Sequence, residues 1–102
     1  MNIENFQNLD RIIHEKARMG IMALLAASTA LTFTEIRDSL KMTDGNLSVQ
    51  IRTLQQAGYV AVTKSYRQRR PCTTCALTAE GRQAFSQYIA TLGKIIEQSK
   101  IS

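Results

Sequence analysis

The side chains most able to do chemistry gather between residues 64 and 75. A lysine, three arginines and two cysteines fall in this stretch, namely Lys64, Arg67, Arg69, Arg70, Cys72 and Cys75. Guanidinium and ammonium groups bind anionic oxygens, whereas thiols bind soft metals or form disulfides. The residues of this stretch could therefore do two kinds of chemistry, anion binding and thiol chemistry.

The two cysteines are poorly spaced for a shared thiol site. Side chains three residues apart on a strand point to opposite faces and lie about 10 Å apart, which is too far for a disulfide or one tetrahedral ion. His14 is the only histidine, so no second ligand pair completes a metal site. We expect no metal, a packing or capping role for His14, a buried Cys75 and a partly exposed Cys72. A redox switch through Cys72 remains an alternative.

Catalysis has little support elsewhere in the chain. The sequence has no glycine-rich phosphate loop, no nucleophile paired with a base and no cluster of carboxylates on one face. We therefore predict no catalytic residue, no cofactor and no enzymatic activity. The residues do not support a small-molecule effector either. A pocket between the domain and the terminal helices would be lined by Met, Leu and Ile, and the same lining is expected of a core or a dimer interface.

Positive charge is concentrated in one part of the chain. The net charge is +5, and residues 41–70 alone hold six basic side chains and one acidic, a balance of +5. A local positive field favours an anionic partner, either nucleic acid or a membrane surface. Membrane binding would need a basic amphipathic helix or a span of about 18 apolar residues, and the sequence has neither. Nucleic acid is the favoured partner, and the lack of a signal-peptide pattern predicts a cytoplasmic location.

A helix over residues 43–57 is predicted inside this basic window. Thr43 suits its N-cap and Gly58 its left-handed end, while Leu47, Ile51 and Leu54 form one narrow apolar stripe. The exposed side carries mainly short polar side chains and no Glu or Lys. It includes Asn46, Ser48, Val49, Gln50, Arg52 and Thr53. Amides and hydroxyls both donate and accept hydrogen bonds, so this face suits base edges and phosphates in a major groove.

The elements around this helix follow from apolar spacing and capping residues. Helices are predicted over residues 9–27 and 34–41, with Thr34 as the N-cap of the second, and a tight turn then leads to residue 43, as in a helix-turn-helix. Alternating apolar residues predict a hairpin over residues 59–77 with arginines at its tip. Thr78 caps a final helix over 78–99.

The apolar stripe of the final helix is longer than a small core can cover. Together with the first helix it predicts a homodimer interface formed by Leu9, Ile13, Tyr88, Leu92, Ile95 and Ile96. The order of elements predicts an α+β, mostly α, winged helix-turn-helix fold in a single domain over residues 1–102, with a three-helix core and a hairpin wing. A two-fold dimer would match a palindromic duplex site.

Several segments resemble a known family. They are residues 18–25 (RMGIMALL), 33–36 (FTEI), 43–48 (TDGNLS), 54–60 (LQQAGYV) and 77–82 (LTAEGR), and they are similar to the small winged-helix transcriptional regulators related to the MarR and ArsR groups. The resemblance implies a dimer built from the terminal helices, a recognition helix in the major groove and a wing on the adjacent backbone or minor groove. One departure is the Cys-Thr-Thr-Cys of residues 72–75, where similar sequences carry a basic residue and an aromatic.

The resemblance assigns DNA contacts by position. The recognition helix would contribute Asn46, Ser48, Val49, Gln50, Arg52 and Thr53, and the wing would contribute Arg67, Arg69 and Arg70. From the residues themselves we add Thr43 and Lys64 to the predicted double-stranded DNA surface of a regulator, expected to be a repressor. The alternatives are a protein–protein module built on the same fold and an effector- or redox-responsive sensor.

Overall fold

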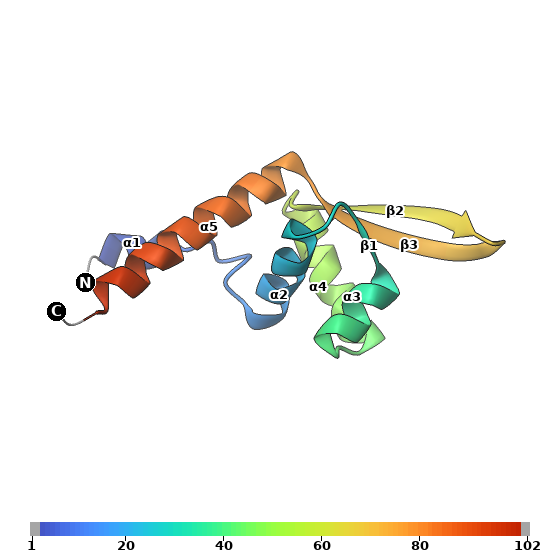
Figure 1. Ribbon diagram of the computed structural model, residues 1–102, viewed down its shortest axis with the longest axis horizontal. Coiled ribbons are helices and arrows are strands. Elements are labelled where there is room, and N and C mark those ends of the chain that lie inside the picture. The colour runs from blue at the N-terminus through green and yellow to red at the C-terminus, as the bar shows by residue number, and fades with distance from the viewer. Residues whose placement is uncertain (1–2, 101–102) are drawn as a thin grey trace.

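The computed structural model describes residues 3–100, so the two ends of the predicted 1–102 domain lie outside the described part. Within it the elements are α1 (Ile3–Gln7), α2 (Lys16–Ala26), β1 (Leu31–Thr32), α3 (Phe33–Leu40), α4 (Asp44–Gln56), β2 (Val60–Arg67), β3 (Arg70–Leu77) and α5 (Ala79–Gln98). The molecule is elongated, with extents of 58 × 25 × 21 Å. Figure 1 shows the terminal helices α1 and α5 at one end and the β2–β3 hairpin at the other, with α2, α3 and α4 between them.

The expected single helix over residues 9–27 is wrong, because α2 begins only at Lys16. Two carboxylates turn the preceding chain by accepting hydrogen bonds from backbone N–H groups. Asp10 accepts from the second and third residues after it at 2.8 and 3.0 Å. Glu15 caps α2 in the same way, at 3.2 and 2.9 Å. Such local bonds compete with a continuous helix, so the apolar spacing reflects a buried turn followed by a shorter helix.

The helix predicted over residues 34–41 begins one residue earlier, because Thr32 rather than Thr34 is its N-cap. The Thr32 hydroxyl accepts from the Glu35 N–H at 3.1 Å, and the Glu35 carboxylate accepts from the Thr32 N–H at 2.9 Å. This reciprocal pair is a capping box. The backbone hydrogen bond from Thr32 is also the main reason that the pKa of Glu35 is lowered.

The prediction for α4 is confirmed closely. Thr43 caps it by accepting from the N–H of Asn46 at 3.1 Å, and its buried residues are Leu47, Ile51 and Leu54. At the other end Gly58 has φ +83°. The N–H groups of Gly58 and Tyr59 donate back to carbonyls of the last turn, both at 3.0 Å, in the pattern of a Schellman motif.

The hairpin predicted over residues 59–77 is formed by β2 and β3. Their antiparallel pairing runs from Val60–Leu77 at the base to Arg67–Arg70 at the tip. The short strand β1 pairs with the base of β3, so the sheet order is β1-β3-β2. Because β1 is so short, most of the hairpin extends away from the helices as a two-stranded arm (Figure 1).

The core forms where α2, α3 and α4 meet the base of the sheet and α5. Its buried apolar residues are Leu9, Ile13, Ile21, Met22, Leu25, Ile36, Leu47, Ile51, Leu54, Val60, Cys75 and Tyr88. Three predicted interface residues belong to this core, since Leu9, Ile13 and Tyr88 are only 8%, 0% and 1% exposed within one chain. These three residues therefore offer a partner almost no surface in this conformation, in contrast to their predicted place in a dimer interface.

The helix predicted over residues 78–99 is present as α5, capped by Thr78. Leu92 and Ile95 are half-buried against the core, whereas Ile96 is 53% exposed. Helix α1 lies beside the C-terminal part of α5 in Figure 1. The exposed large apolar residues of these two helices are Ile3, Phe6, Ile89 and Ile96. Across residues 3–100, no helix has both the length and the hydrophobicity needed to cross a membrane.

Candidate nucleic-acid interface

The outward face of α4 carries the residues that the sequence predicts to contact DNA. Those exposed to solvent are Thr43, Asn46, Ser48, Val49 and Arg52, and those half-buried are Gln50 and Thr53. The buried stripe anchors the helix on the opposite side, so this polar face is held outward. Val49 is 53% exposed, which places an apolar surface among the polar groups.

A groove separates α4 from the hairpin and brings the two predicted contact regions together. It is lined by Ser48, Ile51, Arg52 and Gln55 of α4, Phe33 of α3, and Val62, Lys64 and Thr73 of the hairpin. The exposed basic residues Arg52 and Lys64 thus stand on opposite walls of one concave surface. A concave surface with cations on both walls can hold an anionic backbone between them.

The hairpin tip holds one of its three arginines, Arg69, in a costly backbone conformation. Arg67, Arg69 and Arg70 are all exposed, and the two turn residues Gln68 and Arg69 have φ of 50° and 66°. Positive φ at both positions is the pattern of a type I′ turn, which favours Asn and Gly. A non-glycine residue in this region costs about 1–2 kcal/mol. The side chain of Arg69 is therefore held at the tip at a cost in stability.

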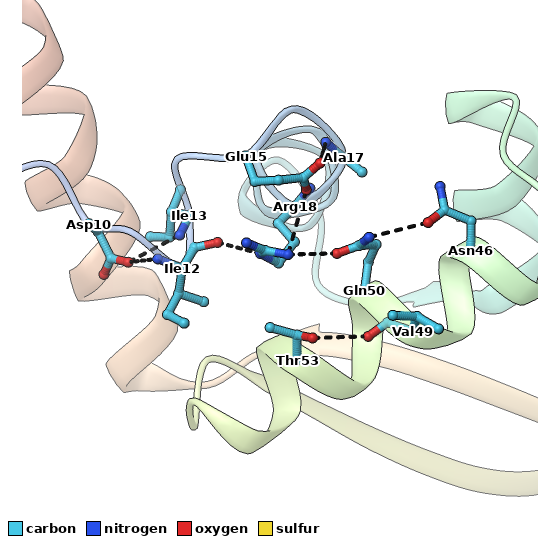
Figure 2. A network of polar contacts seen from close by, with 10 residues as sticks. All are labelled: Asp10, Ile12, Ile13, Glu15, Ala17, Arg18, Asn46, Val49, Gln50 and Thr53. Carbon is cyan, nitrogen blue, oxygen red and sulfur yellow. Dashed lines mark hydrogen bonds and ion pairs between the residues drawn. The ribbon is translucent and has the colours of Figure 1, made fainter.

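One predicted contact residue, Gln50, is engaged within the protein. Arg18 of α2 donates from Nη1 to Gln50 Oε1 at 2.8 Å, and Gln50 Nε2 donates to Asn46 Oδ1 at 3.2 Å. Figure 2 shows these side chains in one continuous line from α2 to the first turn of α4. Sequence reasoning missed Arg18, because no local pattern links it to a residue 32 positions away.

Thr53 has a more limited hydrogen-bonding capacity than expected. Its hydroxyl donates to the carbonyl of Val49 at 3.2 Å, one turn earlier in α4 (Figure 2). A hydroxyl has a single proton to donate. In this conformation Thr53 can only accept a hydrogen bond from DNA, so it is unsuited to phosphate oxygens, which are themselves acceptors.

An ion pair that sequence reasoning also missed joins α3 to the start of α4. Arg37 donates to Asp44 at 2.8 Å and to Asp38 at 3.0 Å. The hydrogen bond to Asp44 is the main reason that the pKa of Arg37 is raised. Asp44 is the single acidic residue between residues 41 and 70. Its pairing with Arg37 reduces the repulsion that an unpaired carboxylate would exert on an approaching anion.

This geometry agrees with what comparison with known proteins finds. A family model for winged helix DNA-binding domains matches residues 17–96. The chain belongs to this family. An uncharacterised protein of Methanocaldococcus jannaschii is 34% identical over 79 residues, which span 78% of this chain and 86% of that protein. This relationship extends the match over most of both proteins.

Solved structures show the same winged helix. A transcriptional regulator homologue from Pyrococcus horikoshii OT3 superposes with a TM-score of 0.90 at 27% identity, covering 96% of this chain and 99% of that one. The apo form of MarR from E. coli superposes with a TM-score of 0.73 at 18% identity, covering 95% and 74%. The predicted fold class and the resemblance to MarR-type regulators are confirmed. In this fold α4 takes the position of the recognition helix and β2–β3 that of the wing.

The cysteines lie in the returning strand of the wing. Cys75 is buried, and its burial raises the pKa of the thiol, which lowers its reactivity. Cys72 is half-buried, as predicted. Among residues 3–100, no three metal-ligating side chains come together. His14, expected to cap or pack, is exposed and hydrogen-bonds through Nδ1 to the Tyr88 hydroxyl at 2.8 Å, with the two ring centroids 5.8 Å apart.

Proposed function

We propose that this winged-helix domain binds double-stranded DNA in a sequence-specific manner as a homodimeric transcriptional regulator. The recognition helix would enter the major groove, and the wing would lie along the adjacent backbone. The observation that carries the proposal is the groove between α4 and the wing, whose opposite walls bear Arg52 and Lys64. As a repressor, the protein would act by occupying DNA that other proteins need.

The two parts of the surface would have different tasks. Phosphate contacts suit the exposed cations of the wing and two hydroxyls at the N-terminal end of α4, namely Lys64, Arg67, Arg69, Arg70, Thr43 and Ser48. Base-edge contacts suit the outward residues of the recognition helix, namely Asn46, Val49, Gln50, Arg52 and Thr53. Phosphate contacts position a protein on a duplex, while base contacts determine its sequence preference.

The homodimer is supported by apolar surface on the terminal helices. Ile3 and Phe6 of α1 and Ile89 and Ile96 of α5 are 63%, 57%, 48% and 53% exposed. Leu92 and Ile95 remain partly accessible beside them. Pairing of these helices around a two-fold axis would cover this surface and present two recognition helices to a palindromic site.

A mobility-shift experiment on the full chain tests the proposal. The duplex is the DNA immediately upstream of the protein's own gene, compared with an unrelated duplex of equal length at two salt concentrations. We expect tighter binding to the upstream DNA and weaker binding to both duplexes at higher salt. A protein–protein module that uses its wing on an acidic partner would show no salt-dependent DNA binding, and that result would reject the proposal.

Two variants test the division of tasks. Replacing Arg69 and Arg70 with Ala should weaken binding to every sequence alike and flatten the salt dependence, by about one unit of slope per lost phosphate contact. Asn46→Ala should instead change the preferred sequence, by about 1–3 kcal/mol at the affected base pair. If both variants changed binding in the same way, the proposed division would be wrong.

A further inference from the structure

A directed chain of hydrogen bonds leads from the N-terminal turn to the DNA-facing side of α4. Arg18 Nε donates to the carbonyl of Ile12 at 2.6 Å, which fixes the guanidinium. Arg18 Nη1 then donates to Gln50 Oε1, and Gln50 Nε2 donates to Asn46 Oδ1. Figure 2 shows the chain with Arg18 between the turn and the recognition helix.

The direction of this chain is set by chemistry. A guanidinium has five N–H donors and no acceptor, so the oxygen of the Gln50 amide must face Arg18. The Gln50 nitrogen then faces Asn46, and only the oxygen of the Asn46 amide can accept from it. Arg18 therefore determines the orientation of two amides that could otherwise each adopt either of two flipped states.

The outcome is that Asn46 offers donors to its surroundings. Its Oδ1 faces Gln50, and within residues 3–100 its exposed Nδ2 donates to no other group. An asparagine with both amide ends free binds adenine through a paired donor and acceptor, whereas guanine presents two acceptors, N7 and O6, in the major groove. An Asn46 amide whose oxygen is turned toward Gln50 presents its nitrogen to a base, and is better matched to guanine.

We propose that Arg18, which lies outside the DNA-contacting face, is a specificity-determining positioning residue: by orienting Gln50 and Asn46 it makes the recognition helix select guanine over adenine and cytosine at the base that Asn46 meets. This inference rests on the proposed DNA-binding function and goes beyond it. It assigns the preferred base and the residue that sets the preference.

Two substitutions should change the preference in different ways. Arg18→Met keeps much of the side-chain volume but removes the donors, so both amides can flip and guanine should lose its advantage to adenine. Gln50→Glu keeps an acceptor for Arg18 but cannot donate to Asn46. Asn46 would then donate to the carboxylate and turn its oxygen outward, which favours a base that offers a donor, such as cytosine through its N4 amino group.

The experiment is selection from a pool of random duplexes, followed by affinity measurements on the selected site with each base at the contacted position. The full chain is used as wild type, Arg18→Met, Gln50→Glu and Gln56→Glu. The last is a matched control, because Gln56 is an exposed residue of the same helix and gains the same charge without touching the hydrogen-bond chain. All four proteins are first compared by circular dichroism and thermal melting.

We expect wild type and Gln56→Glu to select the same guanine-containing site, with Gln56→Glu binding more weakly to all sequences. Arg18→Met should lose most of the guanine preference, a change of about five- to 100-fold in relative affinity. Gln50→Glu should favour cytosine at that position. If Arg18→Met does not fold, Gln50→Glu tests the next link of the chain, since it keeps Arg18 and its bond to the Ile12 carbonyl and removes only the donor to Asn46.

The failures are distinguishable. In one outcome the wild type binds DNA and selects a site, and Gln50→Glu and folded Arg18→Met prefer the same base at the contacted position. That result overturns the role of Arg18 but not the proposed function. A wild type that enriches no sequence overturns both.

Discussion

Gly81 of α5 lies directly against the carbonyl oxygen of Tyr59, so closely that a Cβ atom on Gly81 would sit 2.0 Å from it. The same junction is tied by Thr78, whose N–H donates to the Tyr59 carbonyl at 3.1 Å and whose hydroxyl donates to the Gly58 carbonyl at 2.6 Å. These contacts join the end of the recognition helix, the start of the wing and the start of α5. They explain physically why the Leu-Thr-x-Glu-Gly segment suits this position.

Gly81→Ala should therefore destabilise the fold, because the added methyl group cannot be accommodated without moving backbone. We expect a loss of at least 2 kcal/mol, roughly the cost of overpacking a tight site, measured by urea denaturation without DNA. Gly45→Ala is the matched control, since a Cβ there meets nothing within 4 Å. It should be neutral or stabilise by up to about 1 kcal/mol. Equal effects of the two substitutions would contradict the close contact.

Arg69→Gly should separate stability from DNA binding. Glycine adopts positive φ without a steric cost, so the turn should gain about 0.5–1 kcal/mol in the free energy of unfolding. The lost guanidinium should weaken DNA binding and reduce its salt dependence. Thermal melting and mobility shifts on the same samples check that stability rises while DNA affinity falls. A variant that is both less stable and weaker in binding would show that the arginine is part of the structure instead.

The proposed dimer predicts that charge on the terminal helices will separate the subunits. Replacing Ile89 and Ile96 with Glu should yield a monomer in analytical ultracentrifugation with an unchanged circular dichroism spectrum, because both side chains are about half exposed in the single chain. The control replaces Gln83 and Gln87 of α5, which are also exposed, with Glu. The control should leave the oligomeric state unchanged. A monomeric wild type would remove the basis of the prediction.

The raised pKa of Tyr59 predicts that the fold loses stability at high pH. Its hydroxyl donates to Asp10 at 2.5 Å, and this bond, together with burial and the charges of Asp10 and Glu80, raises the pKa of Tyr59 from 10.0 to about 12. Since the folded-state pKa is raised, the stabilisation is fully present below pH 10 and disappears between pH 10 and about 12.

The titration of tyrosinate absorbance checks this directly. A component near pH 12 should be present in wild type and missing from Tyr59→Phe, and the stability of Tyr59→Phe should fall less steeply between pH 10 and 12. A Tyr59 component near pH 10 would mean that the hydrogen bond to Asp10 is not formed in solution.

Local signals made much of this fold predictable. The N-caps Thr43 and Thr78, the left-handed Gly58 and the alternation through β2 each depend on neighbours within a few residues, so the sequence places these elements correctly. Charge is equally readable, because the concentration of arginines near the hairpin tip needs only counting. The error over residues 9–27 also has a local origin: Asp10 and Glu15 act as backbone caps, yet the apolar spacing around them imitates one long helix.

What the sequence by itself determined is thus the order and type of the elements from α3 onward and the position of the positive charge, since these follow from interactions between close neighbours in the chain. Only the tertiary structure decided that Tyr88 belongs to the core while Ile89 remains exposed. The hydrophobicity of a side chain does not specify which other residues will pack against it. The tertiary structure also decided that Arg18 orients Gln50, because that bond exists only where α2 packs beside α4.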